Sequence, residues 1–428
     1  MIKIMRYGEV PNSEIFARPD ESIDVSGTVS DILQDVKKRG DDAVLDYCQR
    51  FDGISKDNFN LEVTEKEIEE AFLRSVSRLI EILQRAAENI REFHSKQVRT
   101  SFINNSRLRP GVITGQKIVP LDKVGIYVPG GTAAYPSTVL MNAIPAKIAG
   151  VEEIIMVTPS SEGKVNPAIL AAARISGVTR IFKTGGAQAI GALAFGTQTV
   201  PRVDKITGPG NAYVAEAKKQ VFGRVAIDMI AGPSEILVAA DSGCNPEYVA
   251  ADMLSQAEHD KMACAVLVTD SMALAEAVSL ELERQIPLLP RREIARASID
   301  DYGKIIVADT LDTVIDIANE LAPEHLELCV DNPFDYLDQI RHAGSVFLGR
   351  NCPEALGDYF AGPNHTLPTG GTARFSSPLS VDDFVKKYQY CYYTKEALDK
   401  VSSDVACFAE TEGLSAHARS VTVRSMDK

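Results

Sequence analysis

The feature that most constrains the fold is an alternation of short β-branched runs with longer helix-like stretches, which begins near residue 123. A first series of runs reads KVGIYV, EIIMVT, RIFKTG, DKITG and VAIDM, and a second reads EILVAA, CAVLVT, KIIVA, LELCV and SVFLG. Such alternation predicts β-α units built around parallel sheets, and therefore an α/β fold. Gly and Pro punctuate the junction between the two series, in the segment AGPSE at 231–235.

Helical patterns flank the alternating region. The capping box Thr64-Glu-Lys-Glu67, followed by apolar residues at every third or fourth position up to Phe93, predicts one long amphipathic helix. After Val381 the pattern turns helical again, with Gly413 as a break. This C-terminal appendage is too short to bury a core alone, so we expect it to pack on the main body or on a second subunit.

These patterns predict four regions. They are an N-terminal arm over 1–24, a first α/β domain over 25–126 and 235–380, a second α/β domain over 127–234, and a C-terminal helical domain over 381–428.

Composition excludes several classes of partner and location. Lys and Arg number 45 against 59 Asp and Glu, which gives a net charge of −14 and argues against nucleic acid or an anionic membrane as partner. The N-terminus lacks the apolar region of a secretory signal, and no uncharged apolar stretch is long enough for a membrane helix. Seven scattered cysteines without a Cys-x-x-Cys pair indicate reduced thiols, so we expect a cytoplasmic protein.

Several common catalytic motifs are absent. The nearest approach to Gly-x-Gly-x-x-Gly is Gly208-Pro-Gly210-Asn-Ala-Tyr213, which has Tyr in place of the third glycine. Neither a Walker sequence, nor His-Glu-x-x-His, nor Gly-x-Ser-x-Gly occurs. A kinase, an NTPase, a zincin and an α/β-hydrolase are therefore disfavoured.

Glycine-rich turns follow three of the predicted strands. They are Pro129-Gly130-Gly131, Gly185-Gly186 and Gly208-Pro-Gly210. At the carboxyl ends of parallel strands such turns let a ligand approach the main-chain amides of the next helix. The three together predict the rim of one crevice, although each alone is also an ordinary β-α loop.

Pairs of ionisable or polar residues recur in the second half of the chain. They are Gln256 with His259, Glu324 with His325, Asp358 with His365, and Glu412 with His417. Nitrogen and oxygen donors without thiolate suit Zn²⁺ or a similar metal. Because long stretches of sequence separate the pairs, their spacing leaves open both a metal site and a set of unconnected polar residues.

Eight collinear segments resemble the histidinol dehydrogenase family, and the resemblance covers essentially the whole chain. They are GIYVPGGTAAYPSTVLM, KTGGAQAIGALAFGT, TGPGNAYVAEAKKQVFG, AGPSEILV, LSQAEHD, APEHLEL, LGDYFAGPNHTLPTGGTARF and EGLSAHARSV. The resemblance implies two incomplete Rossmann-like domains with small N-terminal and C-terminal helical extensions. It also implies oxidation of L-histidinol to L-histidine through L-histidinaldehyde, the last step of histidine biosynthesis, with two NAD⁺ reduced.

The resemblance also implies a metal site and a substrate site. Its zinc ligands, one ion per subunit, fall on Gln256, His259, Asp358 and His417. Its contacts with histidinol fall on Ser234, Gln256, His259, His325, Asp358, Glu412 and His417, and His365 is a further neighbour. In this family the last histidine comes from the other subunit of an intertwined homodimer, which would make residues 381–428 a dimer-contact domain.

The acid/base pair of the family falls on Glu324 and His325. A neutral imidazole near its ordinary pKa of ~6.5 suits removal of the alcohol proton, so His325 is the expected base for the first oxidation. Glu324 is expected to deprotonate the water that adds to the aldehyde. Contacts with NAD fall on Tyr127, Gln188 and Asn211, each beside one of the glycine turns.

Two other classes of function use the same residues. A metal-dependent hydrolase or aldolase could use the Gln, His and Asp donors on an α/β scaffold, but it would form no NADH. A non-catalytic nucleotide-binding module would tolerate changes at Glu324 and His325. A covalent route through cysteine is not expected, because no cysteine lies within the Glu-His or Gln-x-x-His motifs.

Overall fold

The computed structural model describes residues 1–18, 24–55, 59–130 and 134–426. The chain forms two compact units, one of Met1–Gln97 with Leu121–Phe384 and one of Val98–Pro120 with Val385–Lys428. Part of the predicted arm (19–23) and Gly131 of the first glycine turn lie outside the described residues. Among the described residues, no helix is long and apolar enough to cross a membrane.

A five-stranded parallel sheet carries the first series of predicted strands. Its order is β6 (Arg180–Lys183), β5 (Glu153–Thr158), β4 (Lys123–Tyr127), β7 (Lys205–Thr207) and β8 (Ala226–Ile227). The intervening helices are α6 (Pro136–Ala149), α7 (Pro167–Ser176), α8 (Gly186–Phe195) and α9 (Ala212–Val221). All five strands predicted for the first series are confirmed.

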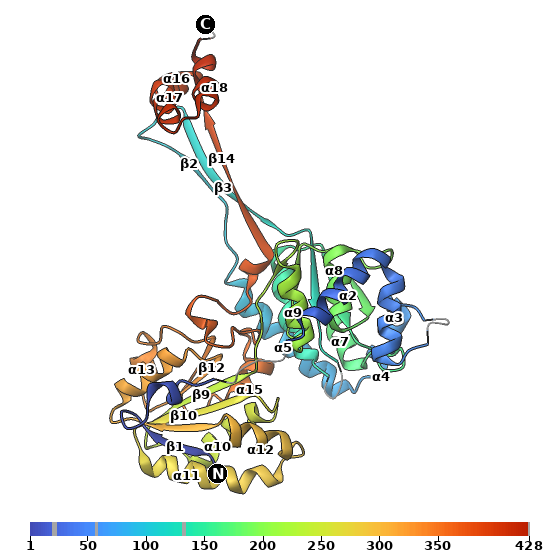
Figure 1. Cartoon of the computed structure of the whole chain (residues 1–428), viewed down its shortest axis with the longest axis vertical. Coiled ribbons are helices and arrows are strands. Elements are labelled where there is room, and N and C mark those ends of the chain that lie inside the picture. The colour runs from blue at the N-terminus through green and yellow to red at the C-terminus, as the bar shows by residue number, and fades with distance from the viewer. Residues whose placement is uncertain (19–23, 56–58, 131–133, 427–428) are drawn as a thin grey trace. The chain divides into compact units, whose positions relative to one another are not determined.

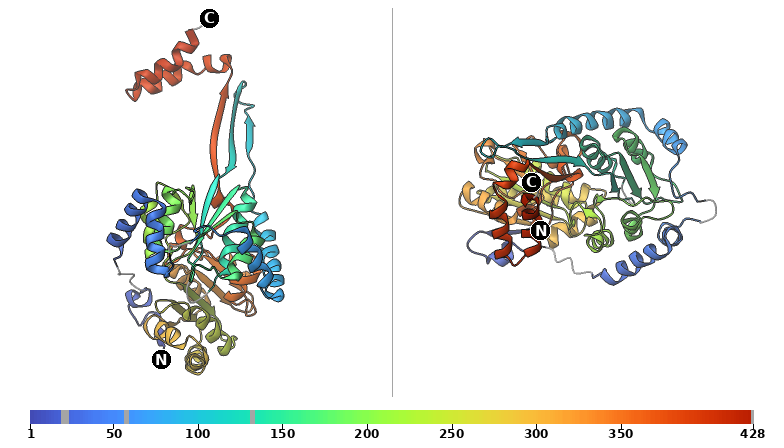
Figure 2. Two further views of the ribbon diagram at one scale, coloured as in Figure 1. Left: turned by 90° about the vertical axis from the view of Figure 1, so that its right-hand side faces the viewer. Right: turned by 90° about the horizontal axis from the view of Figure 1, so that it is seen from above.

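Helices from the N-terminal part of the chain cover this sheet. They are α2 (Ser26–Arg39), α3 (Asp41–Asp52), α4 (Glu65–Arg74) and α5 (Ser77–Ser95). Side chains of α2 and α3 join one hydrophobic cluster with the sheet, and side chains of α4 and α5 join another, so the two pairs lie on opposite sides (Figure 2). This packing differs from the predicted grouping of 25–126 with 235–380.

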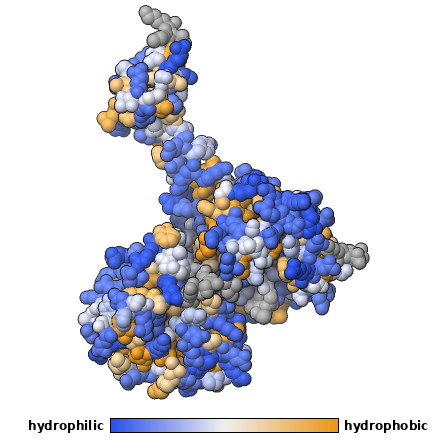
Figure 3. Space-filling view, in the orientation of Figure 1, coloured by the Kyte–Doolittle hydropathy of each residue, from blue (hydrophilic) through white to orange (hydrophobic). Residues whose placement is uncertain are grey.

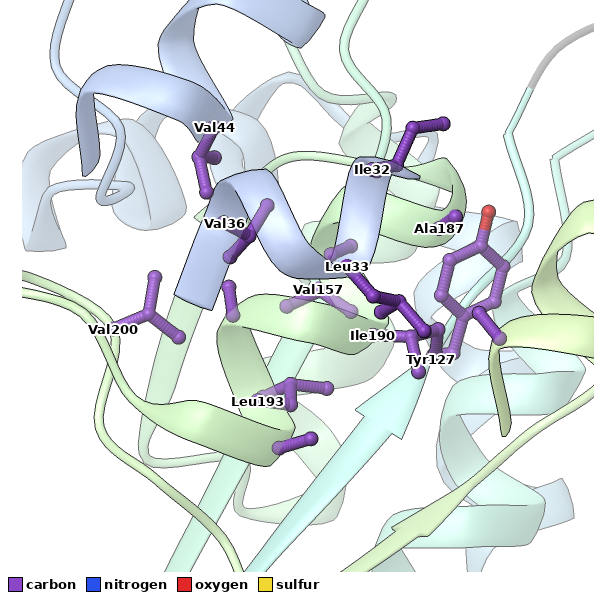
Figure 4. Close-up of a cluster of buried hydrophobic side chains, with 14 of the residues drawn as sticks. Ile32, Leu33, Val36, Val44, Tyr127, Val157, Ala187, Ile190, Leu193 and Val200 are labelled. Atoms are coloured by element: carbon purple, nitrogen blue, oxygen red, sulfur yellow. The ribbon is translucent and has the colours of Figure 1, made fainter. Parts of the chain in front are cut away.

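Close approach between α2 and α8 depends on a glycine. A Cβ atom at Gly191 would lie 3.2 Å from Leu33 and 3.3 Å from Val36, so a larger residue would push α2 away. Figure 4 shows this cluster, with Tyr127 at its edge and the tyrosine hydroxyl pointing away from Leu193 and Val200. The hydrophobic contacts thus place an aromatic side chain at the end of β4.

The capping box predicted at Thr64 and Glu67 is present, with both of its reciprocal hydrogen bonds. The single long helix predicted after it is wrong, because α4 ends at Arg74 and α5 begins at Ser77. Ser75 and Val76 are extended, with ψ of 144° and 125°. The apolar period continues across the break, which explains why the pattern concealed it.

A six-stranded parallel sheet carries the second series. Its order is β1 (Lys3–Arg6), β11 (Lys304–Val307), β10 (Cys264–Thr269), β9 (Glu235–Ala240), β12 (His325–Cys329) and β13 (Ser345–Leu348). Its helices are α10 (Pro246–Ala257), α11 (Met272–Gln285), α12 (Arg292–Asp301), α13 (Leu311–Leu321) and α14 (Phe334–Leu337). The predicted α/β fold is confirmed, and β1 adds an edge strand from the N-terminal arm.

Short elements complete the first unit. They are α1 (Asn12–Ile15), α15 (Glu354–Leu356), the 3₁₀ helices η1 (Ile286–Leu288), η3 (Thr372–Arg374) and η4 (Val381–Phe384), and the π-helical turn η2 (Gly357–Ala361). Hydrophilic residues dominate the face of this unit that Figure 3 presents. The segment predicted to be irregular, 349–379, consists of such short elements and loops.

The second unit is an antiparallel ribbon with helices at one end (Figure 1). Its elements are β2 (Phe102–Asn105), β3 (Val112–Pro120), β14 (Val385–Tyr393), α16 (Lys395–Asp399), α17 (Ser402–Thr411) and α18 (Ser415–Met426). The helical prediction after Val381 is therefore wrong for 385–393, where alternating tyrosines favour a strand. The hydrophobic cluster in the described part of this unit consists of three alanines, Ala406, Ala409 and Ala418.

Candidate active site

Glu324 and His325 lie at the amino edge of the six-stranded sheet, where β9 and β12 run side by side. One residue of β9 contacts both of them through its main chain. The amide of Glu235 donates to Oε2 of Glu324 (2.9 Å), and the carbonyl oxygen of Glu235 accepts a hydrogen bond from Nδ1 of His325 (3.0 Å). Both side chains are buried, so these two bonds fix their positions relative to each other.

The hydrogen bond to a carbonyl determines the tautomer of His325. A carbonyl can only accept, so the proton lies on Nδ1 and the Nε2 atom is the free position. Nε2 is buried without a hydrogen-bond partner, 3.5 Å from Oδ1 of Asp358 and 4.0 Å from Oε1 of Glu354. The ring also stacks on Phe347, with centroids 6.1 Å apart. In its neutral form, His325 therefore presents one lone pair toward a cluster of carboxylates.

The electrostatics of His325 differ from the sequence expectation. Burial disfavours the charged imidazole, but the carboxylates of Glu324, Asp358 and Glu354 outweigh burial and raise the pKa of His325 to about 10. With only these protein groups around it, His325 therefore has a pKa well above the ordinary imidazole value that was expected from the sequence. A neutral imidazole requires a cation that offsets the negative charge around it.

Burial also controls the state of Glu324. Removal from water raises the pKa of the Glu324 carboxyl to about 8, although His325 and the amide of Glu235 favour the ionised form. A carboxyl with a pKa in this range can exchange a proton near neutral pH, which is what a general base needs.

Asp358 and His365 lie next to each other in the segment after β13. Asp358 belongs to the π-helical turn η2, and its main-chain oxygen accepts a hydrogen bond from Nδ1 of His365 (3.1 Å). Burial would raise the pKa of Asp358, but His325, His365 and His259 hold it below the usual range. Asp358 is thus a carboxylate at neutral pH, surrounded by three imidazoles.

Gln256 and His259 lie at the C-terminal end of α10. The helix ends at Ala257, so His259 occupies the turn just beyond it. Gln256 is buried and its amide lies against Glu354, whereas His259 is exposed at the surface of this unit. Protein atoms around the His259 imidazole partly remove it from water, which lowers its pKa and favours the neutral form that ligates metals.

The residues gathered here fit a divalent cation. Ligand atoms of His325, Glu354 and Asp358 lie within 4.8 Å of one another. The amide of Gln256 contacts Glu354, and the charge of His259 affects Asp358. Amide oxygen, imidazole and carboxylate form a donor set that suits Zn²⁺, and the buried Nε2 atom of His325 has no hydrogen-bond partner in the structure.

Three acidic residues of this region escaped the sequence analysis. They are Glu354, Glu327 and Asp252. Glu327 accepts from the amide of Glu354 (2.7 Å), and burial raises the pKa of Glu327 to about 9 and that of Asp252 to about 6. Glu327 could have been found, because a glutamate inside the buried run LELCV needs a partner. Glu354 carries no comparable signal in its flanking sequence.

The remaining predicted substrate contacts fall on both units. Ser234 directly precedes β9, beside the peptide that holds Glu324 and His325. Glu412 caps the end of α17 and His417 lies in α18, both exposed in the second unit.

The glycine turns meet at the carboxyl edge of the five-stranded sheet. Gly130 and Gly185 both pack on Pro159, where a Cβ atom would lie 2.6 Å and 2.8 Å from its ring. Gly208 has a φ of +113°, and a Cβ atom there would lie 2.1 Å from the carbonyl oxygen of Tyr127. The three turns are therefore neighbours that only glycine permits, as the predicted crevice requires.

The predicted NAD contacts lie around these turns. The hydroxyl of Tyr127 accepts a hydrogen bond from the amide of Gly186 (3.1 Å), and Oδ1 of Asn211 accepts from the amide of Val214 at the start of α9 (3.2 Å). Gln188 is buried in α8, and its Oε1 atom has no hydrogen-bond partner. Two helix N-termini and a buried polar atom without a partner fit an anionic dinucleotide.

Comparison with known proteins assigns the family. A family model described as histidinol dehydrogenase matches residues 17–425. The chain belongs to the histidinol dehydrogenase family. Histidinol dehydrogenase of Geobacter sulfurreducens is 55% identical over 412 residues, which are 96% of each chain. That of Bacillus subtilis is 55% identical over 398 residues, 93% of this chain and 92% of the relative.

A solved structure agrees with this assignment. The crystal structure of histidinol dehydrogenase from Elizabethkingia anophelis has a TM-score of 0.93 and 40% identity, and the match covers 99% of this chain and 98% of that one. The resemblance stated from the eight motifs is thus confirmed, and the chain is an oxidoreductase of the alcohol and aldehyde type.

Proposed function

We propose that this chain oxidises L-histidinol to L-histidine through L-histidinaldehyde, with zinc bound and two NAD⁺ reduced, as the last step of histidine biosynthesis in the cytoplasm. The observation that carries the proposal is that the main chain of one residue, Glu235, holds both Glu324 and His325. It supports the proposal because two successive proton removals need two bases, and both candidates are bound by the same residue, with His325 3.5 Å from Asp358.

The first oxidation needs a base for the hydroxyl proton. The Nε2 atom of His325 carries the free lone pair, and it takes this proton as the C–H hydride leaves and the aldehyde forms. The hydrogen bond from Nδ1 to Glu235 keeps the ring oriented while Nε2 gains its proton.

The second oxidation needs water. Glu324 as carboxylate removes a proton from a water molecule, whose oxygen adds to the aldehyde carbon to give the anion of the hydrate, with the negative charge on the former aldehyde oxygen. Loss of a second hydride from that carbon gives the carboxyl group of histidine. Burial of Glu324 and His325 excludes further water from the reacting atoms.

The residues that would hold the bound groups are those that the family resemblance implies. Gln256, His259, Asp358 and His417 would hold zinc, which when bound orients the imidazole and amino nitrogens of the substrate. Tyr127, Gln188 and Asn211 would hold NAD⁺, which when bound accepts the hydride of each oxidation. Ser234, Glu412 and His365 would complete the surroundings of the substrate.

A homodimer with shared sites is part of the proposal. The second unit buries little apolar surface of its own and exposes Phe102, Tyr392 and Phe408. Exposed aromatic residues of this kind usually contact another protein surface. Glu412 and His417 of the partner subunit would then complete each site.

The direct experiment is incubation of the purified, zinc-loaded protein with L-histidinol and NAD⁺. We expect two NADH for each histidine formed. A hydrolase or aldolase using the same donors would form no NADH, and that result would overturn the proposal.

To test ligand sharing, chains with His417→Ala and His259→Ala are mixed, and recovered activity in the mixed dimer is expected because one of its two sites is intact. Mixtures as inactive as the separate variants would contradict shared sites.

A further inference from the structure

Arg18 connects two segments that are distant in sequence. Its Nη1 atom donates to Oε1 of Glu235 (2.8 Å), and its Nη2 atom donates to the main-chain oxygen of Leu321. Glu235 begins β9, and Leu321 is the last residue of α13. One guanidinium therefore joins the start of a strand to the end of a helix.

Both segments lead directly to the acid/base pair. The main chain of Glu235 binds Glu324 and His325 through its amide and its carbonyl oxygen. On the other side, Leu321 precedes Glu324 by only a tight turn, in which Ala322 adopts a left-handed conformation with a φ of +44°. Arg18 thus contacts both Glu235, whose main chain orients Glu324 and His325, and the end of the helix that leads into their turn.

The arm that carries Arg18 is itself held in place. Nζ of Lys304 donates to the main-chain oxygens of Ile15 (2.9 Å) and Ala17 (2.6 Å). Ile15 is fully buried in the hydrophobic cluster that includes side chains of α13. The guanidinium therefore projects from a fixed main chain, so its two hydrogen bonds can transmit position and not only charge.

The contact with Glu235 also has an electrostatic reason. The side chain of Glu235 is only 10% exposed, and Arg18 is its ion-pair partner. A buried carboxylate without a cation is strongly unfavourable, so loss of Arg18 would force Glu235 to take up a proton or move toward water. Either change disturbs Glu235, whose main chain binds Glu324 and His325.

We propose that Arg18 is a positioning residue for the two oxidations: by bridging Glu235 and Leu321 it fixes the distance between β9 and the turn that carries Glu324 and His325. This inference rests on the proposed function, because it concerns the same acid/base pair. Displacement of catalytic groups by ~1 Å can cost ~100-fold in rate, so a residue that touches no substrate can still control the rate.

The test compares three variants of the full-length, zinc-loaded enzyme. Arg18→Ala removes both contacts, and Arg18→Lys keeps a positive charge but not the two-pronged bridge. Arg374→Ala is the matched control, because Arg374 donates to the oxygen of Glu320 (2.7 Å), also at the end of α13, without contacting Glu235. For Arg18→Ala we expect kcat for both histidinol and histidinaldehyde to fall by ~10- to 100-fold, with KM for histidinol and zinc content little changed.

Chemical rescue provides a readout that general destabilisation would not give. Millimolar guanidinium should restore part of the kcat of Arg18→Ala, but not that of His325→Asn. Arg374→Ala should keep the wild-type kcat. A wild-type kcat in Arg18→Ala overturns the inference, and so does a loss that appears in KM or zinc content alone.

Two further results keep the inference open to refutation. If Arg18→Ala does not fold, the kcat of Arg18→Lys is the test. A folded Arg18→Lys enzyme with a reduced kcat supports the positioning role, and one with a wild-type kcat refutes it. Failure of the parent enzyme to reduce NAD⁺ with histidinol would instead refute the proposed function, so the two failures are distinct.

Discussion

The side-chain amide of Gln256 lies against the carboxylate of Glu354, and in the amide orientation that satisfies both groups its nitrogen is 2.8 Å and 3.1 Å from the two oxygens. The hydroxyl of Ser255 donates to Oε2 of the same carboxylate (2.9 Å). A carboxylate accepts and does not donate, so Glu354 turns the amide nitrogen toward itself and leaves the amide oxygen free. The free oxygen is the atom of Gln256 that can ligate a cation.

The first prediction concerns this orientation. We expect Glu354→Gln to weaken zinc binding by ~10- to 100-fold, because a second amide can donate to Gln256 as well as accept and no longer selects one orientation. Zinc affinity is measured by competition with a chelator, without reference to activity. Glu247→Gln, at the exposed start of the same helix, should leave the affinity unchanged. Equal affinities for Glu354→Gln and the wild type would contradict the proposed orientation.

The second prediction concerns the division of labour between the acid/base residues. Glu324→Gln should slow oxidation of the aldehyde by roughly 100-fold or more and slow alcohol oxidation less, because only the aldehyde step needs an activated water. His325→Asn should reverse this order or slow both steps. Single-turnover measurements with histidinol and with histidinaldehyde separate the two. If both variants lost equal rate in alcohol and aldehyde oxidation, Glu324 and His325 would not divide the two oxidations between them.

The third prediction is the pH dependence of aldehyde oxidation. Burial raises the pKa of Glu324 to about 8, so below that pH the carboxyl keeps its proton and cannot act as a base. The rate should therefore rise with pH through about 8 and then level off. A pH series of single turnovers with the aldehyde tests this, and the rising limb should be absent in Glu324→Gln. A rate independent of pH over this range would show that Glu324 is not the titrating base.

The α/β core was predictable because its strands are read from local patterns. Each of the ten runs identified after residue 123 became a strand, since short runs rich in β-branched and other apolar residues are a local signal of a strand. The edge strand Lys3–Arg6 has no turn signal before it, and the ribbon of the second unit depends on the pairing of 112–120 with 385–393. Pairing across such a separation has no local signature.

The candidate site was partly predictable. Glu324 and His325 form a recognisable dipeptide, but their meeting with Asp358 depends on how the segment after β13 folds back. Glu354 was missed because its role comes from its contact with the amide of Gln256, which lies about a hundred positions earlier in the chain, and not from any local motif. The pKa of His325 was misjudged for the same reason, since two of the three carboxylates that raise it, Glu354 and Asp358, come from the segment after β13.

The fourth prediction concerns Gly357, at the start of the π-helical turn that carries Asp358. A Cβ atom there would lie 2.3 Å from the ring of Phe347, which stacks on His325. We expect Gly357→Ala to destabilise the fold by about 1–3 kcal/mol through overpacking, and to lower activity by displacing Phe347 against His325. Denaturant unfolding and kcat measure the two effects. Gly27→Ala, in a helix with open space at that position, should not lower stability, and equal stabilities for the two variants would refute the overpacking argument.

The fifth prediction concerns Asp52, a partly buried carboxyl remote from the acid/base pair. Asp52 ends α3, where the helix dipole disfavours negative charge, and its Oδ2 atom has no hydrogen-bond partner. Burial raises the pKa of Asp52 from 3.8 to about 6. Between these values the folded state holds a proton that the unfolded state has lost, so the stability of the wild type falls as pH rises from 3.8 to about 6.

Asp52→Asn removes this titration. The Tm of the variant should exceed that of the wild type at neutral pH, and the difference should shrink as pH falls through about 6 and vanish near 3.8. Thermal unfolding at a series of pH values measures the difference, with Asp31→Asn on the exposed face of α2 as control. Because Asn cannot titrate, a Tm difference that stays constant across this range would mean that the higher Tm of Asp52→Asn comes from new contacts and not from removal of a buried charge.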